Sequence, residues 1–217
     1  RERGIERKEK EDAYELLLQQ YQQMALTIPN RVHPDTPIGD EAAFVVRHVG
    51  GSIPTFSFAP KDHETLFRER DMLDFERGSK VSGAKSYFAK NDLVLLNHAL
   101  LRYGMDRVLA HGFSLLETPD MVKEEVLAGA GFQPRGDEDQ FYMIEGSDLV
   151  MIGTAEVTTL GYHANEVLDL SAGPKKYASL SHCYRKEAGA YGRTSKGLYR
   201  VHQFTKLELF VFCTPEQ

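Results

Sequence analysis

The sequence predicts an α+β fold, with an antiparallel β-sheet flanked by helices and preceded by the end of a helical coiled-coil arm. Near the N-terminus, apolar residues recur at spacings of three and four, which is the period of a helix. Residues 91–112 form a second helical stretch with a wide apolar face. Beyond residue 140, apolar and polar residues alternate at period two, and the turn-forming stretches lie too close together for crossover helices.

Composition narrows the classes of function. The chain of 217 residues carries a formal charge of −6, so any contact with nucleic acid has to come from a local basic patch or from a part of the protein outside these residues. Since no apolar run approaches the roughly 18 residues that cross a bilayer, we expect no membrane partner. The two cysteines, Cys183 and Cys213, lack a CxxC partner and predict inert buried thiols in a reducing compartment.

Residues 1–28 predict a helix whose apolar positions form an a/d seam, namely Tyr14, Leu17, Tyr21, Met24 and Ile28. Two heptads fit a coiled-coil arm and an ordinary amphipathic helix equally well. Pro29 ends the helix, because it biases the residue before it away from helical geometry. Residues 29–60 contain five prolines and predict an irregular linker, so the main domain covers residues 61–217.

The first half of this domain is predicted to be helical. Residues 63–78 predict a helix with paired charges, and residues 91–112 predict a longer one that Asn91 or Asp92 caps. So wide an apolar face on the longer helix predicts burial against a sheet or a second subunit. Pro119 breaks the strand that follows, and since proline cannot donate to a ladder, this strand should lie at an edge or end there.

Strand parity in the second half brings polar side chains to one surface, because residues i and i+2 of a strand share a face. We expect helices on one side of this sheet. Thr154 shares a face with Glu156, and Arg185 with Glu187. The last strand carries the longest polar row: Arg200, His202, Phe204, Lys206 and Glu208. One interpretation is that this face of the sheet is exposed to solvent. A carboxylate within the apolar stretch "VMIGTAEVTTL" instead favours a recessed face that binds a ligand, because a buried carboxylate is unfavourable unless a partner pairs with it.

The loop between the last two strands combines glycines with cations, at Gly189, Gly192, Arg193, Lys196, Gly197 and Arg200. Such a loop can bring positive charge over a ligand on the sheet, and a mobile, solvated turn is an equally good interpretation. The spacing matches neither a Walker A loop nor a GxGxxG fingerprint.

The stretch "YRKEAGAYGRTSKGLYRVHQFTKLELF" resembles motif 2 of the class II aminoacyl-tRNA synthetases, in the form found in bacterial and organellar seryl-tRNA synthetases. The resemblance spans nearly the whole chain, through "IPN", "LDFERGSKVSGAKSYF", "GTAEV" and "TPEQ". Its specific element is the register of "TAE", "RKE", "VHQF" and "KLE", in which Thr154, Arg185 and Glu208 stand 31 and 23 residues apart.

The resemblance implies a serine-tRNA ligase that makes seryl-adenylate from L-serine and ATP and transfers the seryl group to the 3′ end of tRNA(Ser). Because the attacking carboxylate and the α-phosphate repel each other, such a site has to supply fixed positive charge. Arg185 is expected to bridge these anions, Glu187 to accept from the adenine amino group and Phe204 to stack on adenine. The remaining residues expected to shape the ATP pocket are Val201, His202 and Gln203.

The family pattern also implies a serine pocket. Thr154 and Glu156 would hold the α-ammonium, and Glu208 would reach the hydroxyl. Mg²⁺ should bridge the ATP phosphates with Glu208 and an acidic residue further along the chain close by. Lys206 is either a structural partner of Glu208 or a ligand contact.

Other polar residues allow weaker expectations. Arg193 and Lys196 either contact the acceptor end of the tRNA or form a solvated loop tip. A zinc site is not expected, because the histidines lack ligand spacing with Cys183. His63 should be a structural partner.

The family further implies a homodimer through residues 91–119. Two alternatives stay open: a ligase that charges a carrier protein, against which the helical arm argues, and an inactive RNA-binding paralogue, against which the intact site residues argue. The chain starts without methionine and motif 3 of the family would lie beyond Gln217, so we expect an inactive fragment of a longer enzyme. "AGFQPRGDEDQFYMI" favours the mitochondrial matrix over the cytoplasm.

Overall fold

The computed structural model describes residues 2–29, 31–132, 140–187 and 197–217, which divide into two compact units between Phe56 and Ser57. The first unit contains helix α1 (Glu2–Leu26) and a short 3₁₀ helix (Glu41–Ala43), and its other described residues are irregular. The predicted N-terminal helix and the irregular stretch after it are therefore confirmed.

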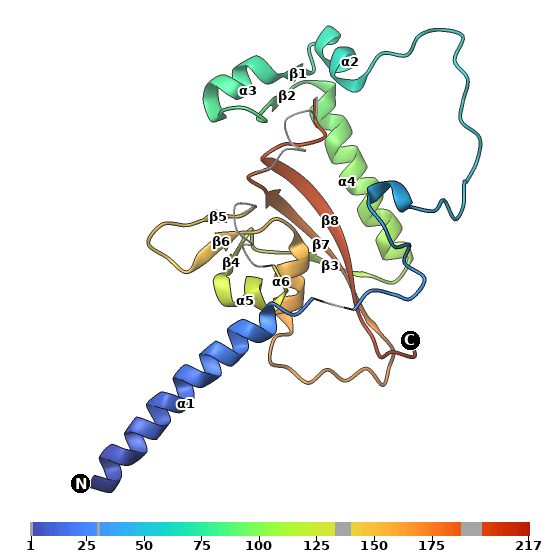
Figure 1. Ribbon diagram of the computed structural model, residues 1–217. Helices are drawn as coiled ribbons and strands as arrows, with labels where there is room; N and C mark the ends of the chain where they lie inside the picture. The colour runs from blue at the N-terminus through green and yellow to red at the C-terminus, as the bar shows by residue number, and fades with distance from the viewer. Residues whose placement is uncertain (1, 30, 133–139, 188–196) are drawn as a thin grey trace. The chain divides into compact units, whose positions relative to one another are not determined.

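The second unit holds the remaining elements (Figure 1). In chain order they are α2 (His63–Glu69), β1 (Leu73–Asp74), α3 (Phe75–Ser82), β2 (Phe88–Ala89), α4 (Asp92–Ala110), β3 (Ser114–Glu117), β4 (Met121–Lys123), α5 (Glu124–Gly129), β5 (Tyr142–Met143), β6 (Leu149–Met151), α6 (Ala155–Tyr162), β7 (Lys175–Tyr184) and β8 (Gln203–Phe212). No helix within the described ranges is long and apolar enough to cross a membrane.

The main sheet has the strand order β3–β7–β8. β7 and β8 pair antiparallel over ten residue pairs, from Lys175 with Phe212 to Tyr184 with Gln203, which confirms the predicted antiparallel hairpin. β3 pairs with β7 in parallel, a direction that alternation along one strand does not encode. β3 lies at one edge of this sheet and ends at Glu117, which agrees with the edge or strand end predicted from Pro119.

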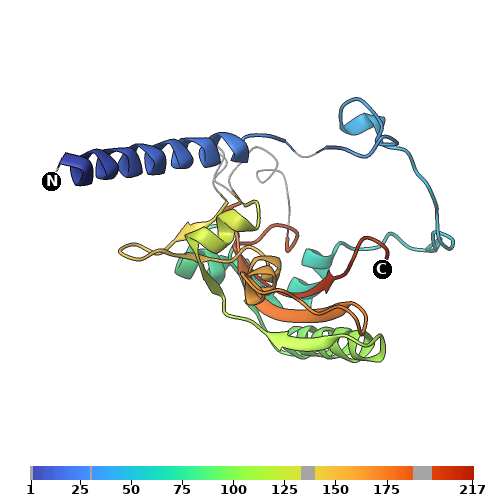
Figure 2. The same cartoon turned by 90° about the horizontal axis from the view of Figure 1, so that it is seen from below.

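Helices cover both sides of this sheet, so the expectation of helices on one side was wrong (Figure 2). On one side, Thr159 of α6 hydrogen-bonds Ser179 of β7 with 2.6 Å between their hydroxyl oxygens. Ser179 pairs with Glu208, so Leu207 points to the other side. There Gly104 of α4 lies so close that a Cβ on it would be 3.0 Å from Leu207 Cδ2. The sheet is thus held between two helices, with its ligand-binding candidates on the α6 side.

A smaller antiparallel sheet, ordered β4–β6–β5, lies beside the main sheet, to which the main-chain bond from Tyr184 N to Ile152 O joins it at 2.8 Å. Residues in its strands or directly beside them form a hydrophobic core with residues of α5 and α6: Val122, Leu127, Phe141, Val150, Ile152 and Val157. This core fixes the start of α6 against the end of β7, where the candidate site lies.

Three predictions about this unit differ from the structure, two on secondary structure and one on the burial of a cysteine. Residues 63–78 are not one helix, because the chain reverses after α2 and Asp74 starts α3 by accepting the Arg77 N–H at 2.9 Å. The run around Thr154 is not one long strand, because β6 ends at Met151 and Thr154 caps α6. Cys213 is exposed, since it lies just past β8, whereas Cys183 is buried as predicted.

Candidate active site

A triangle of polar side chains lies between α6 and β8. Thr154 is the N-cap of α6, where its Oγ1 accepts the Glu156 N–H at 3.2 Å. The same hydroxyl donates to Glu208 Oε2 at 2.9 Å and accepts from Lys206 Nζ at 2.9 Å. Lys206 and Glu208 also form an ion pair. Because a hydroxyl has one hydrogen and two lone pairs, these three contacts use the whole bonding capacity of Thr154, which is 4% exposed.

Sequence and fold together explain this triangle. Lys206 and Glu208 are two residues apart in β8 and therefore share the face that α6 covers. Thr154 reaches that face from the start of the helix and not from a strand, so the predicted common strand face of Thr154 and Glu156 was wrong. Glu156 lies in the first turn of α6, where a carboxylate is favoured by the helix dipole.

Arg185 follows the last residue of β7 and lies on the same side as Phe204. Its Nε donates to the Gly153 carbonyl at 3.1 Å, and its guanidinium lies over the Phe204 ring, 5.1 Å from the centroid. The Gly153 backbone passes close enough that a Cβ there would lie 3.7 Å from Arg185 Cγ. The guanidinium is thus held beside the first residues of β8, on the side of the sheet where the carboxylate of Glu208 lies.

Glu187 is bound by two cations. Arg200 Nη1 contacts its Oε2 at 2.9 Å, and Lys85 Nζ donates to its carbonyl at 2.9 Å. Its φ of 51° shows that the chain has left the strand, so Arg185 and Glu187 do not share a strand face as predicted. Arg200 precedes β8; it was expected among the cations that can reach over a bound ligand, but its pairing with Glu187 was not predicted.

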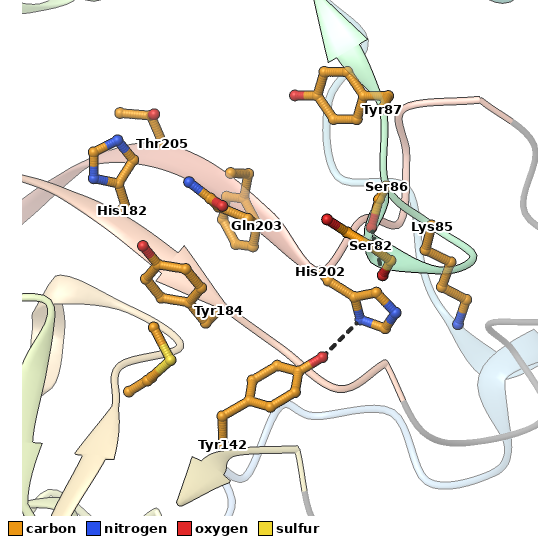
Figure 3. Close-up of a pocket in the computed structure, with 12 residues that line it drawn as sticks. Ser82, Lys85, Ser86, Tyr87, Tyr142, His182, Tyr184, His202, Gln203 and Thr205 are labelled. Carbon is orange, nitrogen blue, oxygen red and sulfur yellow. Dashed lines mark hydrogen bonds between the residues drawn. The ribbon is translucent and has the colours of Figure 1, made fainter. Parts of the chain in front are cut away.

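Two of the other three predicted ATP-pocket residues, His202 and Gln203, line a cavity on the opposite side of the sheet from Phe204. Val201 is buried. Gln203 pairs with Tyr184, so its side chain lies on the opposite side of the sheet from Phe204. There it lines a cavity of about 510 Å³ together with Tyr142 and His202 (Figure 3). Only Phe204 of the "VHQF" group is thus a candidate base-stacking residue on the α6 side.

Part of the loop after β7 lies outside the described residues. Arg193 and Lys196, the predicted tRNA contacts, fall in that part. Where the chain is described again, His63 Nε2 accepts the Leu198 N–H at 3.0 Å, which confirms His63 as a structural partner. Gly197, with φ of 64°, packs so closely on this ring that any side chain would collide with it.

The side chain of Cys183 lies on the face of the main sheet that α6 covers, and it is fully buried. Burial raises the pKa of its thiol, and the Ser181 hydroxyl and the charges of Lys206 and Arg185 oppose that shift only in part. The thiol is therefore kept neutral and unreactive. Within the described ranges, no group of three or more His, Cys, Asp or Glu side chains gathers as a metal site would require.

The site combines a fixed guanidinium, an aromatic face and a carboxylate with its own counter-ion. Comparison with known proteins connects this arrangement to one family. Residues 141–217 match the tRNA synthetase class II core domain of the G, H, P, S and T enzymes. A serine–tRNA ligase of Treponema denticola is 51% identical over 192 residues, which are 88% of this chain and 45% of the relative. Residues 141–217 belong to the class II tRNA synthetase core family, and most of the chain is similar to serine–tRNA ligases.

Solved structures agree with this assignment. A seryl-tRNA synthetase of Pyrococcus horikoshii, crystallised with ATP, is 36% identical and superposes with a TM-score of 0.86 over 96% of this chain and 51% of that one. A cytoplasmic serine–tRNA ligase of Naegleria fowleri with AMP gives 0.81 at 30% identity, over 97% of this chain and 50% of that one. The chain spans about half the length of the curated relatives it matches. The predicted resemblance and fold class are confirmed.

Proposed function

We propose that the protein is a serine-tRNA ligase that activates L-serine with ATP and transfers the seryl group to the 3′ end of tRNA(Ser). The observation that carries the proposal is that Arg185, Phe204 and the triangle of Thr154, Lys206 and Glu208 lie on one side of the sheet, beside α6. The identity with serine–tRNA ligases over 88% of the chain supports the same function.

Serine recognition rests on the triangle. Serine differs from alanine by a hydroxyl, and a site built to hydrogen-bond that hydroxyl rejects the analogue without it, because a buried partner would be left unpaired. Glu208 has this role in the proposal, with Thr154 fixing its carboxylate. Glu156, in the first turn of α6, supplies the carboxylate for the α-ammonium, and Thr154, which was predicted to share that role, has its hydroxyl fully used within the triangle.

Adenylate formation rests on Arg185. The serine carboxylate attacks the α-phosphate, and a planar guanidinium can hydrogen-bond oxygens of both groups and offset their repulsion. Phe204 offers its ring to the adenine, and Glu187 offers a carboxylate to the adenine amino group. Since Glu187 is paired with Arg200, nucleotide binding should rearrange that pair.

Mg²⁺ remains a prediction. Its expected neighbour, Glu208, already uses Oε2 for Thr154 and Lys206. No described cluster of acidic residues accompanies it, so these residues alone do not fit a magnesium site and no step is assigned to the ion.

The proposal includes a homodimer and a tRNA partner. On α4 and β3, large apolar side chains are exposed in the single chain: Val94, Leu95, Leu96, Leu100, Tyr103, Leu109 and Leu115. A second copy would remove this surface from water, as the predicted interface at residues 91–119 requires. Contacts of Arg193 and Lys196 with the tRNA acceptor end and a mitochondrial location remain part of the proposal.

Amino-acid-dependent pyrophosphate exchange tests the proposal on the full-length protein. With ATP, we expect exchange with serine and much less with threonine or alanine, followed by seryl transfer to tRNA(Ser). Exchange without transfer to tRNA would favour the carrier-protein ligase. Absence of serine-dependent exchange, with the protein folded, would overturn the proposal and favour the inactive paralogue.

A further inference from the structure

We infer that His202 is a positioning residue for Arg185, acting from the opposite side of the sheet through a hydrogen bond that its Nδ1–H donates to the Arg185 carbonyl. The inference rests on the proposed function for its activity readout. Its structural readout is independent of that function.

Two oxygens lie at hydrogen-bond distance from one ring nitrogen. His202 Nδ1 is 3.0 Å from the Arg185 carbonyl oxygen and 3.0 Å from the Tyr142 hydroxyl. A carbonyl can only accept, whereas a hydroxyl can accept or donate. The tautomer that satisfies both contacts therefore carries its hydrogen on Nδ1 and shares that one hydrogen between the carbonyl oxygen and the Tyr142 hydroxyl oxygen, both of which accept. A bare Nδ1 would accept from Tyr142 but would leave two lone pairs facing each other at the carbonyl.

This bond completes a reciprocal pair. Arg185 N donates to the His202 carbonyl at 3.0 Å, while the His202 ring donates back to the Arg185 carbonyl. The pair lies one step beyond the last ladder pair, Tyr184 with Gln203. The ring therefore extends the hydrogen bonding of the sheet to the residue whose guanidinium the proposed reaction needs.

Arg185 follows the last residue of β7, so without the bond from the His202 ring its carbonyl would lose the contact that extends the sheet to this residue. The next residue but one, Glu187, already has a φ of 51°, so the backbone turns sharply there. The side chain of Arg185 depends on this backbone to keep its Nε bond to Gly153 and its place over Phe204. A shift of about 1 Å at a group that orients substrate can cost about a hundredfold in rate.

Tyr142 holds the ring from the smaller sheet. It comes from β5, and Figure 3 shows its hydroxyl directed at the His202 ring, which lines the same cavity. The His202 main chain is fixed as well, since its N–H donates to the Lys85 carbonyl at 3.2 Å. The ring thus connects the smaller sheet to Arg185, whereas the family resemblance had placed it in the nucleotide pocket.

Isosteric substitutions separate a donor from an acceptor at this position. His202→Asn keeps an N–H at the place of Nδ1, whereas His202→Asp has the same shape and can only accept. We expect Asn to retain serine-dependent exchange within about threefold of the wild type and Asp to lose about tenfold to a hundredfold, mainly in kcat. Tyr142→Phe should lower serine-dependent exchange less than His202→Asp does. His33→Asp, which adds the same charge in the irregular stretch of the first unit, is the control.

Long-range ¹H–¹⁵N spectra of the histidine rings give the second readout. We expect the neutral His202 ring to carry its hydrogen on Nδ1, whatever reaction the protein catalyses. Equal activity of the Asp and Asn variants, or a ring that carries its hydrogen on Nε2, would overturn the inference. If the wild type shows no serine-dependent exchange, the proposed function fails while the tautomer measurement still decides the hydrogen bond.

Discussion

Lys206 Nζ lies 2.9 Å from Thr154 Oγ1 and pairs with Glu208, whose Oε2 accepts the Thr154 hydroxyl hydrogen. The carboxylate proposed to recognise serine thus carries its own counter-ion. Its charge and direction are set before any substrate arrives, which is a form of preorganisation.

Replacing Lys206 by methionine should therefore weaken serine recognition specifically. A hydrogen bond to a charged group contributes about 1.5–3 kcal/mol, so kcat/KM for serine should fall about tenfold to a hundredfold. Lys206→Arg, which keeps the charge, should lose less. Exchange kinetics at varied serine and varied ATP check this, and a variant that raises only the KM for ATP would contradict the role given to Lys206.

The sequence predicted much of this site, because strand parity depends only on spacing. Lys206 and Glu208 share a face in the structure as their spacing requires. Parity failed at Thr154, since "AEVTTL" is rich in β-branched residues while packing and the threonine cap select a helix there. It failed again at His202, because β8 begins one residue later and the ring turns to the other side. These two failures, and the one at Glu187 beyond the end of β7, lie where a regular element starts or ends, and local periodicity does not encode such boundaries.

A second prediction concerns the buried pair that joins α6 to the main sheet. Thr159 Oγ1 lies 2.6 Å from Ser179 Oγ and 2.7 Å from the Ala155 carbonyl, and both side chains are fully buried. Thr159→Val leaves the Ser179 hydroxyl without this partner and should lower the free energy of unfolding by about 1–3 kcal/mol. Chemical denaturation measures it.

Adding Ser179→Ala to Thr159→Val should recover most of that loss, because the double variant leaves no unpaired hydroxyl at the contact. Strictly additive losses in the two single variants and the double variant would argue against a direct bond.

The two cysteines should differ in reactivity. Cys183 is fully buried and burial raises the pKa of its thiol, so both access and the thiolate fraction are low. Cys213 is exposed. With iodoacetamide near neutral pH, mass spectrometry should find Cys213 alkylated and Cys183 intact, and unfolding in urea should make both reactive. Comparable labelling of both thiols in the folded protein would contradict the packing described for β7.

The last prediction concerns the exposed side of α4. Leu96, Leu100 and Tyr103 follow the helical period, and Leu100 and Tyr103 are 61% and 65% exposed in the single chain. If a second copy covers this side, Leu100→Glu places an unpaired charge in an apolar interface, which is strongly unfavourable. Light scattering coupled to size exclusion should then give the mass of a dimer for the wild type and of a monomer for the variant. Val167→Glu, at a fully exposed position in another segment, should leave the mass unchanged, and a wild type that is monomeric at micromolar concentration would refute the interface.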